Sequence, residues 1–366
     1  MRDIWEEQLN WIKNKEPFVL ARVIKTWRSA PRKTGAGMLI GKGSGKNSLP
    51  KVIGSVSGGC IESAVIEEAM EVLKKGESRQ LSYGVEDELA LSVGLSCGGE
   101  VTVFLERHWA FSKNKSTQKV WKTLQNCIKN NKPAILFTFI SPTNISSLKK
   151  LSPILVLPDE NSDNPFKIVG HLKFHKQEFS NLAKSIFHER ENKIINFRNE
   201  EVFVQIFPRQ DQLLIIGAGH ISIPLVKFAR EINFITVVID PRKVFTSAER
   251  FLIKPDHLIS KWPDDILTKW PINKDTYAIL LTHDPKIDDP ALHILLKKDL
   301  KYIGALGSNR THIKRCDRLK KAGFDEESIK KIKGPAGFDI GAQTASEIAL
   351  SMITEVVAAK HGKKNY

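Results

Sequence analysis

The segment that most constrains the fold is QLLIIGAGHISIPLVKFAREINFITVVIDPR, which occupies residues 212–242. An apolar run leads into two glycines, a helix-like pattern and a second apolar run that ends in Asp240. Gly217 and Gly219 allow a tight turn and a close approach of the backbone to a pyrophosphate at the helix N-terminus. Asp240 follows about 20 residues later, where an acidic side chain can accept hydrogen bonds from a ribose. The segment predicts a dinucleotide-binding fold.

Two residues leave the ligand of this fold open. Ser222 stands where the fingerprint has its third glycine, and we expect it to loosen the packing of the helix on the sheet. Arg242 favours a 2′-phosphate on the ribose, whereas Asp240 opposes one. The fold by itself does not establish that a nucleotide binds. The candidate nucleotide-binding residues are Gly217, Gly219, His220, Asp240 and Arg242.

The alternation of strands and helices continues to the end of the chain. TYAILLTHD and KYIGALGS read as strands that are each followed by a helix, and GPAGFDIGAQTA leads into a last helix. Polar residues at these strand ends would lie along the carboxyl edge of a parallel sheet, where such folds bind ligands; the candidates among them are Ser308 and Arg310. His283 with Asp284, Asp288 and Asp289 fits no metal motif, so a helix-capping loop is the favoured interpretation.

In the first half of the chain, GSVSGGCIESAVIEEAMEVLKKG places a cysteine where a glycine-rich turn meets a helix pattern. Gly58 and Gly59 permit positive φ, and apolar residues recur after Cys60 at helical spacing until Gly76. Unpaired backbone N–H groups and the positive end of the helix dipole would then point towards Cys60. This placement favours the thiolate, which attacks electrophiles and binds metals.

A second cysteine has a similar setting, because Cys97 is followed by Gly98 and Gly99. A free cysteine is most often a small buried hydrophobic residue, and that alternative stays open. Two cysteines beside glycine pairs nevertheless favour a functional role for Cys60 and Cys97. The other two, Cys127 and Cys316, have helix-like surroundings without glycine and are interpreted as structural.

The segment between Arg28 and Gly37 alternates basic residues with turn formers. Arg32 and Gly35 within it are candidates for binding an anion through a side-chain cation and free backbone N–H groups. A turn between two strands with solvated charges explains the same pattern equally well.

Composition excludes several classes of protein. The net charge is +15, but the lysines are spread along the whole chain with no basic stripe interleaved with aromatics, so we expect no nucleic-acid binding. No segment reaches the roughly 18 uninterrupted apolar residues of a membrane span, and the first 20 residues lack the apolar core of a signal peptide. Four scattered cysteines are unlike a secreted disulfide framework. We therefore expect a cytoplasmic protein without a membrane partner.

The expected fold class is α/β, with two domains. Residues 1–209 would form an N-terminal mixed α+β domain, whose middle, about residues 111–209, shows no chemistry. Residues 210–366 would form a C-terminal Rossmann-like domain with a parallel sheet. A helix is expected over residues 1–16, and strands are expected at PFVLARVIKTW, EVTVFLE, AILFTFI, LSPILVLP and EVFVQIFP.

The motifs, taken in order, resemble the XdhC/CoxI family of xanthine dehydrogenase accessory factors. The resemblance rests on SAPRKTGAGMLI, GSVSGGCIE, YGVEDELALSVGLSCGGEVTVFLE, LLIIGAGHISIPL, VVIDPR, LTHDPKIDDPAL, YIGALGSNRTH and GPAGFDIGAQTASEIALSMITEVVA. It implies a maturation chaperone that binds the molybdenum cofactor (molybdopterin), protects it while a cysteine desulfurase supplies its sulfur, and delivers it to an apo molybdenum hydroxylase. The family's paired-glycine cysteines correspond to Cys60 and Cys97, which would contact molybdenum through the cofactor.

Other features of the ligand and assembly are expected alongside this resemblance. From its charge, the segment around Arg32 and Gly35 would suit the cofactor's phosphate. NAD(P) is a second candidate ligand, and we expect a homo-oligomer. The alternative function is an NAD(P)-dependent oxidoreductase with redox-active thiols.

Overall fold

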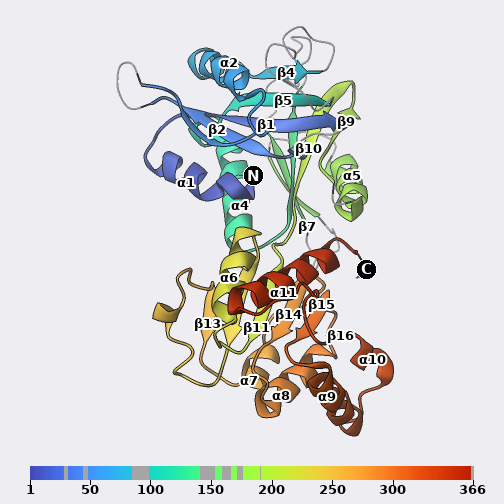
Figure 1. Cartoon of the computed structure of the whole chain (residues 1–366). Coiled ribbons are helices and arrows are strands. Elements are labelled where there is room, and N and C mark those ends of the chain that lie inside the picture. Colours follow the sequence, from blue (N-terminus) through green and yellow to red (C-terminus); the bar gives the residue numbers. More distant parts are fainter. Residues whose placement is uncertain are drawn as a thin grey trace. The chain divides into compact units, whose positions relative to one another are not determined.

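The computed structural model describes residues 1–28, 32–43, 48–84, 99–140, 153–158, 166–170, 176–189 and 191–363 (Figure 1). The contacts between Cα atoms divide the chain into two compact units, Met1–Arg209 and Gln210–Tyr366. In the described residues no helix is both long and apolar enough to cross a bilayer.

Unit 1 contains two antiparallel five-stranded sheets. The first has the strand order β3-β2-β1-β5-β4 and the second the order β8-β7-β6-β10-β9. The strands are β1 (Phe18–Trp27), β2 (Gly37–Gly41), β3 (Lys51–Gly54), β4 (Arg79–Tyr83), β5 (Glu100–Arg107), β6 (Ala134–Phe139), β7 (Ile154–Pro158), β8 (Phe166–Val169), β9 (Lys193–Phe197) and β10 (Glu200–Phe207). The helices are η1 (Arg2–Ile4), α1 (Trp5–Lys13), α2 (Glu62–Lys75), η2 (Trp109–Phe111), α4 (Lys115–Lys129) and α5 (Lys176–Glu189).

Each sheet of unit 1 buries an apolar face against helices. The α2 side chains Val65, Ala69 and Val72 pack on the first sheet, and Gly76 ends this helix in the left-handed conformation at φ 81°. On the second sheet, apolar residues of α5 and of α4 belong to two separate hydrophobic clusters. The first helix and all five strands that were predicted from the sequence of this half are confirmed.

The prediction for this half was incomplete, because strands β2, β3, β4, β8 and β9 were not predicted. Gly37 was interpreted only as the end of a turn-rich segment, but Gly37–Gly41 is strand β2, and all five of its residues are buried. The glycines at its ends obscured an apolar core of three residues, which pairs with β1 on one side and with β3 on the other.

Arg22 connects the two sheets of unit 1 although it is fully buried on β1. Its guanidinium donates hydrogen bonds to Oε1 of Gln205 and Oγ1 of Thr138, both at 3.2 Å, and pairs with the Glu106 carboxylate. The rings of Trp109 and Phe203 lie 5.1 and 5.5 Å from it. A buried cation needs such partners, so they explain how a charge is tolerated between the sheets.

Unit 2 contains one six-stranded sheet with the order β13-β12-β11-β14-β15-β16, and every neighbouring pair is parallel. The strands are β11 (Gln212–Ile216), β12 (Ile235–Ile239), β13 (His257–Ile259), β14 (Thr276–Leu280), β15 (Tyr302–Ala305) and β16 (Ile332–Lys333). The helices are α6 (Ser222–Glu231), η4 (Ala248–Arg250), α7 (Pro263–Leu267), α8 (Pro285–Leu295), α9 (Asn309–Lys321), α10 (Glu326–Lys330) and α11 (Ala345–Lys360). In sequence this order reads 3-2-1-4-5-6, which is that of dinucleotide-binding domains and confirms the predicted Rossmann-like fold.

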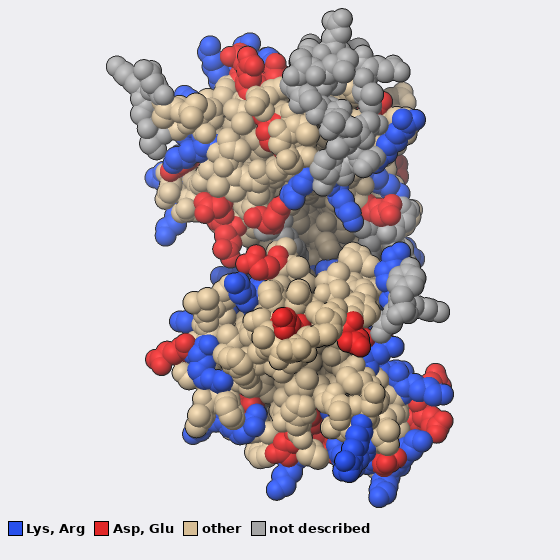
Figure 2. All heavy atoms as spheres, viewed as in Figure 1, with Lys and Arg blue, Asp and Glu red and all other residues tan. Residues whose placement is uncertain are grey.

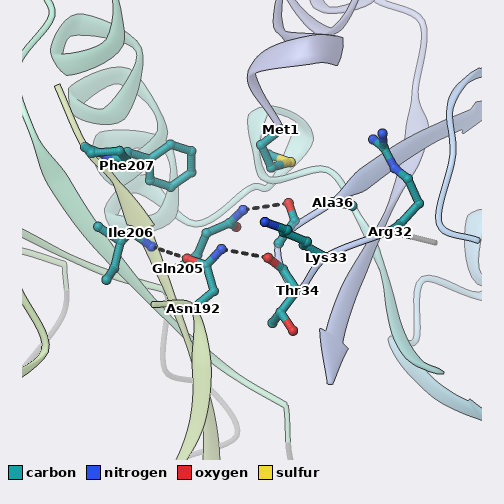
Figure 3. Close-up of a pocket in the computed structure, with 11 residues that line it drawn as sticks. Met1, Arg32, Lys33, Thr34, Ala36, Asn192, Gln205, Ile206 and Phe207 are labelled. Atoms are coloured by element: carbon teal, nitrogen blue, oxygen red, sulfur yellow. Dashed lines mark hydrogen bonds between the residues drawn. The ribbon is translucent and has the colours of Figure 1, made fainter. Parts of the chain in front are cut away.

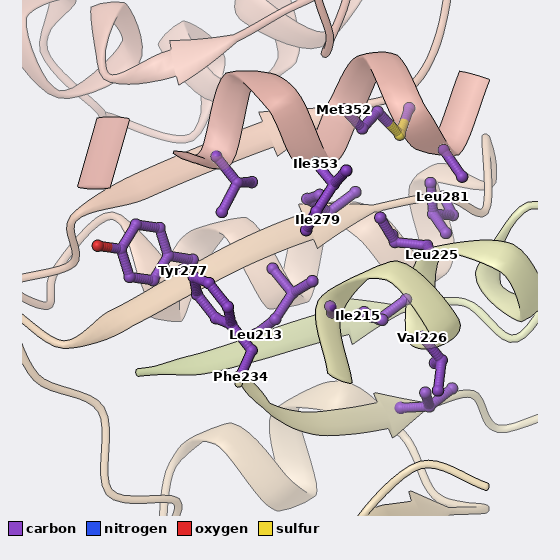
Figure 4. Packing of buried hydrophobic residues seen from close by; sticks show 14 of the residues in the cluster. Leu213, Ile215, Leu225, Val226, Phe234, Tyr277, Ile279, Leu281, Met352 and Ile353 are labelled. Atoms are coloured by element: carbon purple, nitrogen blue, oxygen red, sulfur yellow. The ribbon is translucent and has the colours of Figure 1, made fainter. Parts of the chain in front are cut away.

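The strands of this sheet are apolar on both faces because helices cover both faces. Leu213 and Ile215 of β11 pack with α6 and α11 (Figure 4), while Leu214 and Ile216 belong to the cluster on the opposite face. The strand order reverses between β11 and β14, so the turns that follow these two strands define the crevice where such folds bind ligands.

Candidate functional site

The loop that carries Cys60 has the positive φ angles that its two glycines were predicted to allow. Gly58 and Gly59 have φ values of 91° and 126°, which favour glycine. Helix α2 begins at Glu62, two residues after the cysteine. The Cys60 side chain is half-buried and packs at the edge of the cluster between α2 and the first sheet.

The N–H groups of this loop are not free, in contrast to the prediction from the sequence. The Glu62 carboxylate accepts hydrogen bonds from the N–H groups of Ser57, Gly58 and Gly59 at 2.9, 3.1 and 2.9 Å. It also accepts one from the Val56 N–H at 3.2 Å. The N–H groups of Cys60 and Ile61 donate to the Ser57 hydroxyl at 3.0 and 3.1 Å. The prediction failed because it assigned no partner to the first acidic residue of the helix.

These contacts act on the ionisation of Glu62. Burial alone would raise its pKa, but hydrogen bonds from the hydroxyls of Ser55 and Ser57 and from the backbone lower it to about 2. The carboxylate is therefore ionised at every physiological pH.

Cys97 and Gly98, the second predicted cysteine motif, lie outside the described residues. Cys60, Cys127 and Cys316 are free thiols. Cys127 lies in the core of unit 1, where burial raises the pKa of its thiol, and Cys316 lies 3.6 Å from the His312 ring nitrogen. Among the side chains that the structure describes, no three His, Cys, Asp or Glu residues are grouped so as to hold a metal ion.

A cavity of about 440 Å³ opens beside the predicted anion-binding segment of unit 1 (Figure 3). One wall is formed by residues 32–36, between β1 and β2, and the other by Asn192 and residues 205–208 of β10 and its end. Arg32 and Lys33 supply two cations to this lining. Arg32 donates to the Asp3 carboxylate at 2.6 Å and, through Nε, to the Ser55 carbonyl at 3.2 Å.

The Ser55 contact links the cavity to the cysteine loop. Ser55 opens that loop, and its hydroxyl donates to Glu62 at 2.6 Å. The structure thus joins two motifs that the sequence predicted separately, because Arg32 of the anion-binding segment contacts Ser55 at the start of the loop that carries Cys60.

Two amide side chains on the far wall of the cavity were missed by the sequence prediction. Asn192 donates to the Thr34 carbonyl at 2.8 Å, and Gln205 donates to the Gly35 carbonyl at 3.2 Å (Figure 3). At Gly35, with φ 92°, a Cβ would overlap the Asn192 amide, so the close approach requires glycine. These two hydrogen bonds attach residues 34–35 to the second sheet. Their region carries no motif, so its sequence contained no signal for this role.

In unit 2, the glycine turn after β11 has the expected geometry. Gly217 has φ 106°, and a Cβ there would lie 2.6 Å from Cγ2 of Thr282. A Cβ on Gly219 would meet no atom within 4 Å, so the backbone faces open space there. In the described parts of the chain, no acceptor lies within hydrogen-bonding distance of the Gly219 and His220 N–H groups. This turn can receive an anion.

Ser222 does not loosen the helix packing, contrary to expectation. Its side chain is fully buried, and its hydroxyl donates to the Gly219 carbonyl at 2.6 Å. This hydrogen bond closes the turn at the position where the fingerprint has glycine.

Asp240 lies at the end of β12 as predicted, but its carboxylate is already engaged. It is fully buried; Oδ2 accepts from the Ala218 N–H and Arg242 Nη2, both at 2.7 Å, and Oδ1 accepts from Arg242 N and Nε, both at 2.9 Å. Burial acts to raise its pKa, but these bonds hold it below the ordinary value. Four contacts fill the acceptor sites of a carboxylate, so a ribose hydroxyl could bind it only after Arg242 moved.

The ends of β14 and β15 serve first as helix caps. Asp284 accepts from the Lys286 N–H at 2.9 Å at the start of α8, which confirms the capping interpretation. Ser308 accepts from the Thr311 N–H at 3.3 Å at the start of α9, and Arg310 is exposed in its first turn. Asp288 is buried against the Thr282 hydroxyl at 2.5 Å, and this burial raises its pKa to about 6.

Comparison with known proteins gives a match to a family model in each of the two units. A model described as the XdhC and CoxI family matches residues 11–84, and one described as the XdhC Rossmann domain matches residues 213–356. A Bacillus subtilis (strain 168) protein described as a probable subunit of xanthine dehydrogenase is 25% identical over 351 residues, 95% of both chains.

Two further matches cover most of the chain. The molybdenum cofactor insertion chaperone PaoD of Escherichia coli (strain K12) is 24% identical over 342 residues, 93% of this chain and 83% of PaoD. The crystal structure of a protein described as a xanthine dehydrogenase from Bacillus halodurans is 26% identical, has a TM-score of 0.76, and covers 98% of this chain and 96% of its own.

Proposed function

Because the chain belongs to the XdhC and CoxI family, we propose that it is an accessory protein of a xanthine-dehydrogenase-type molybdenum hydroxylase. In this role it binds the molybdenum cofactor as cargo and delivers it to the apoenzyme. The similarity to PaoD, a molybdenum cofactor insertion chaperone, over 93% of the chain supports this role.

The observation that carries the proposal is the hydrogen bond between Arg32, beside the cavity of unit 1, and the backbone at the start of the Cys60 loop. The Arg32 guanidinium, which lines the cavity, is hydrogen-bonded to Ser55 at the start of the Cys60 loop. A cavity of about 440 Å³ lies within the size range of small-molecule sites. Lys33 suits a phosphate group, Arg32 could bind one after leaving the Asp3 carboxylate, and a thiolate suits a sulfur-ligated metal. The two chemistries match the two ends of the cofactor.

The finer steps of the proposal concern sulfur. Cys60 and Cys97 would contact the metal end of the cofactor and shield it while a cysteine desulfurase supplies the terminal sulfur. Soft thiolate ligands are appropriate for this task because they match a sulfur-ligated metal centre. A homo-oligomeric state remains a prediction.

Cofactor retention tests the proposal. Wild-type protein mixed with free molybdenum cofactor and desalted should retain pterin fluorescence and molybdenum, and the Cys60→Ala, Cys97→Ala double variant should lose both. Cys316→Ala removes a half-buried thiol from unit 2 and is the matched control, which should bind as wild type does. If the double variant retained as much cofactor as wild type, neither thiol would be needed for cofactor binding.

A second candidate ligand is NAD(P), at the turn between β11 and α6. The open space at Gly219 and the free N–H groups there favour a pyrophosphate. In the alternative function, an NAD(P)-dependent oxidoreductase, the nucleotide would bind at this turn. Saturable NADPH or NADH binding with turnover, unaffected by molybdenum supply, would support that alternative against the chaperone role.

A further inference from the structure

The Glu62 carboxylate is the centre of an unusually dense set of hydrogen bonds. Four consecutive backbone N–H groups and two serine hydroxyls donate to it: the N–H groups of Val56, Ser57, Gly58 and Gly59, with the side chains of Ser55 and Ser57. Successive backbone N–H groups in a turn can form a concavity that binds anions. Here the chain's own carboxylate fills that concavity.

These donors show that Glu62 organises the loop and not the helix. A capping-box glutamate accepts from N–H groups at the residue where the helix starts, as Glu347 does from Gln343 and Thr344 before α11, whereas Glu62 accepts from four. All four N–H donors to Glu62 belong to residues 56–59, which precede α2. Glu62 is the first residue of α2, so a rigid 14-residue helix holds the carboxylate in the loop.

Cys60 lies between the last donor and the acceptor. Its own N–H donates to the Ser57 hydroxyl, and the same hydroxyl donates to Glu62. The backbone on both sides of the cysteine is therefore tied to one carboxylate. Gly58 and Gly59 have positive φ in this arrangement, a conformation that glycine adopts readily, so the hydrogen bonds select one of several conformations open to the loop.

We propose that Glu62 is a positioning residue for Cys60, whose carboxylate replaces an external anion in the glycine loop and so fixes the direction of the thiol. This inference rests on the proposed role of Cys60 in binding the cofactor. It also assigns the cofactor's anionic groups to the Arg32 and Lys33 cavity, since the glycine loop is closed to them. The low pKa of Glu62 is consistent with a carboxylate that stays in place across the physiological range.

The test is chemical rescue of Glu62→Ala, which leaves the six donors without an acceptor. We expect faster hydrogen exchange in residues 56–60, faster iodoacetamide alkylation of Cys60 and about a tenfold loss of cofactor affinity, the scale for lost hydrogen bonds to one charged group. Excess sodium formate should occupy the concavity and restore the hydrogen exchange, the alkylation rate and the cofactor affinity to their wild-type values. Sodium chloride of equal ionic strength should restore none of them. Glu67→Ala removes an exposed glutamate from the same helix and should behave as wild type.

Several outcomes would overturn the inference. Unchanged Cys60 alkylation in Glu62→Ala is one, and formate that restores loop protection without restoring cofactor affinity is another. If Glu62→Ala does not fold, Glu62→Gln, which keeps the side-chain volume, replaces it. Its rate of Cys60 alkylation and its cofactor affinity are then compared with those of wild type, and unchanged alkylation again overturns the inference. Failure of the proposed function gives a different result, because wild type would then retain no cofactor while the effects on exchange and alkylation persisted.

Discussion

Two carboxylates of this protein, the half-buried Glu62 and the fully buried Asp240, bind backbone N–H groups of the chain itself. Glu62 holds the loop before α2, and Asp240 holds the turn after β11 through the Ala218 N–H. In both cases hydrogen bonds to the ionised form outweigh the effect of burial on the pKa. Residues that a motif search assigns to a ligand can therefore be committed to the fold itself.

Replacing Asp240 with Asn should destabilise unit 2. At pH 7 the loss should be about 2 kcal/mol, the scale of hydrogen bonds to a charged group. Asp240 has a lowered pKa, so its contribution is present above the ordinary value near 3.8 and is lost as pH falls through the folded value. The difference in unfolding free energy between wild type and Asp240→Asn should shrink below about pH 4.

Urea unfolding read by hydrogen exchange of peptides from residues 212–280 measures this difference. Asp299→Asn removes an exposed carboxylate from the same unit and is the control. A gap between wild type and Asp240→Asn that stayed constant down to pH 2 would mean that the charge of Asp240 contributes nothing.

At the scale of elements, the connection between β11 and α6 contains two glycines, Gly217 and Gly219, that are needed for different reasons. Gly217 is required by the fold, because its φ is 106° and a Cβ would overlap Thr282. Gly219 meets no neighbour, so only a ligand would need it to be glycine. The two positions have the same residue type for different physical reasons.

Alanine at each of these glycines should therefore have different effects. Gly217→Ala should lower the stability of unit 2 by about 1–3 kcal/mol, the cost of a strained backbone position. Gly219→Ala should leave the melting temperature nearly unchanged but weaken NADPH or NADH binding, because its methyl group would lie where a pyrophosphate approaches. Calorimetric melting and nucleotide titration measure the two effects. Nucleotide affinity that survives Gly219→Ala would exclude this turn as the binding site.

At the scale of the whole molecule, each unit has its own hydrophobic cores. The clusters of residues 1–209 and those of residues 210–366 share no members. On the face shown in Figure 2, acidic residues are interspersed among the lysines and arginines of both units. The prediction that the protein binds no nucleic acid, made from the spread of lysines along the chain, remains to be measured.

Because each unit buries its own core, fragments 1–209 and 210–366 should each fold alone. Each should show a cooperative thermal transition by circular dichroism, with the intact chain as the reference. A fragment 210–366 without such a transition would mean that its sheet depends on residues of unit 1.

The sequence by itself determined the class of unit 2 and, in unit 1, the helices before β1 and after Cys60 and five of the ten strands described. Helix and strand periodicity, a glycine turn and an acidic strand end are local patterns, because each reflects backbone conformation and burial within a few residues. The chain from β11 to β12 and the helix after Cys60 were predictable for this reason. Strand β2 was not, because glycines at its ends mimic a turn.

Only the tertiary structure decided which polar groups meet. The Thr34 carbonyl and the Asn192 amide are 158 residues apart in sequence, and nothing in either segment indicates the other. Glu62 and Asp240 lie in recognisable motifs, yet their partners are the chain's own N–H and guanidinium groups. A carboxylate binds whichever donors the folded backbone places around it, and that choice depends on three-dimensional positions that sequence spacing does not contain.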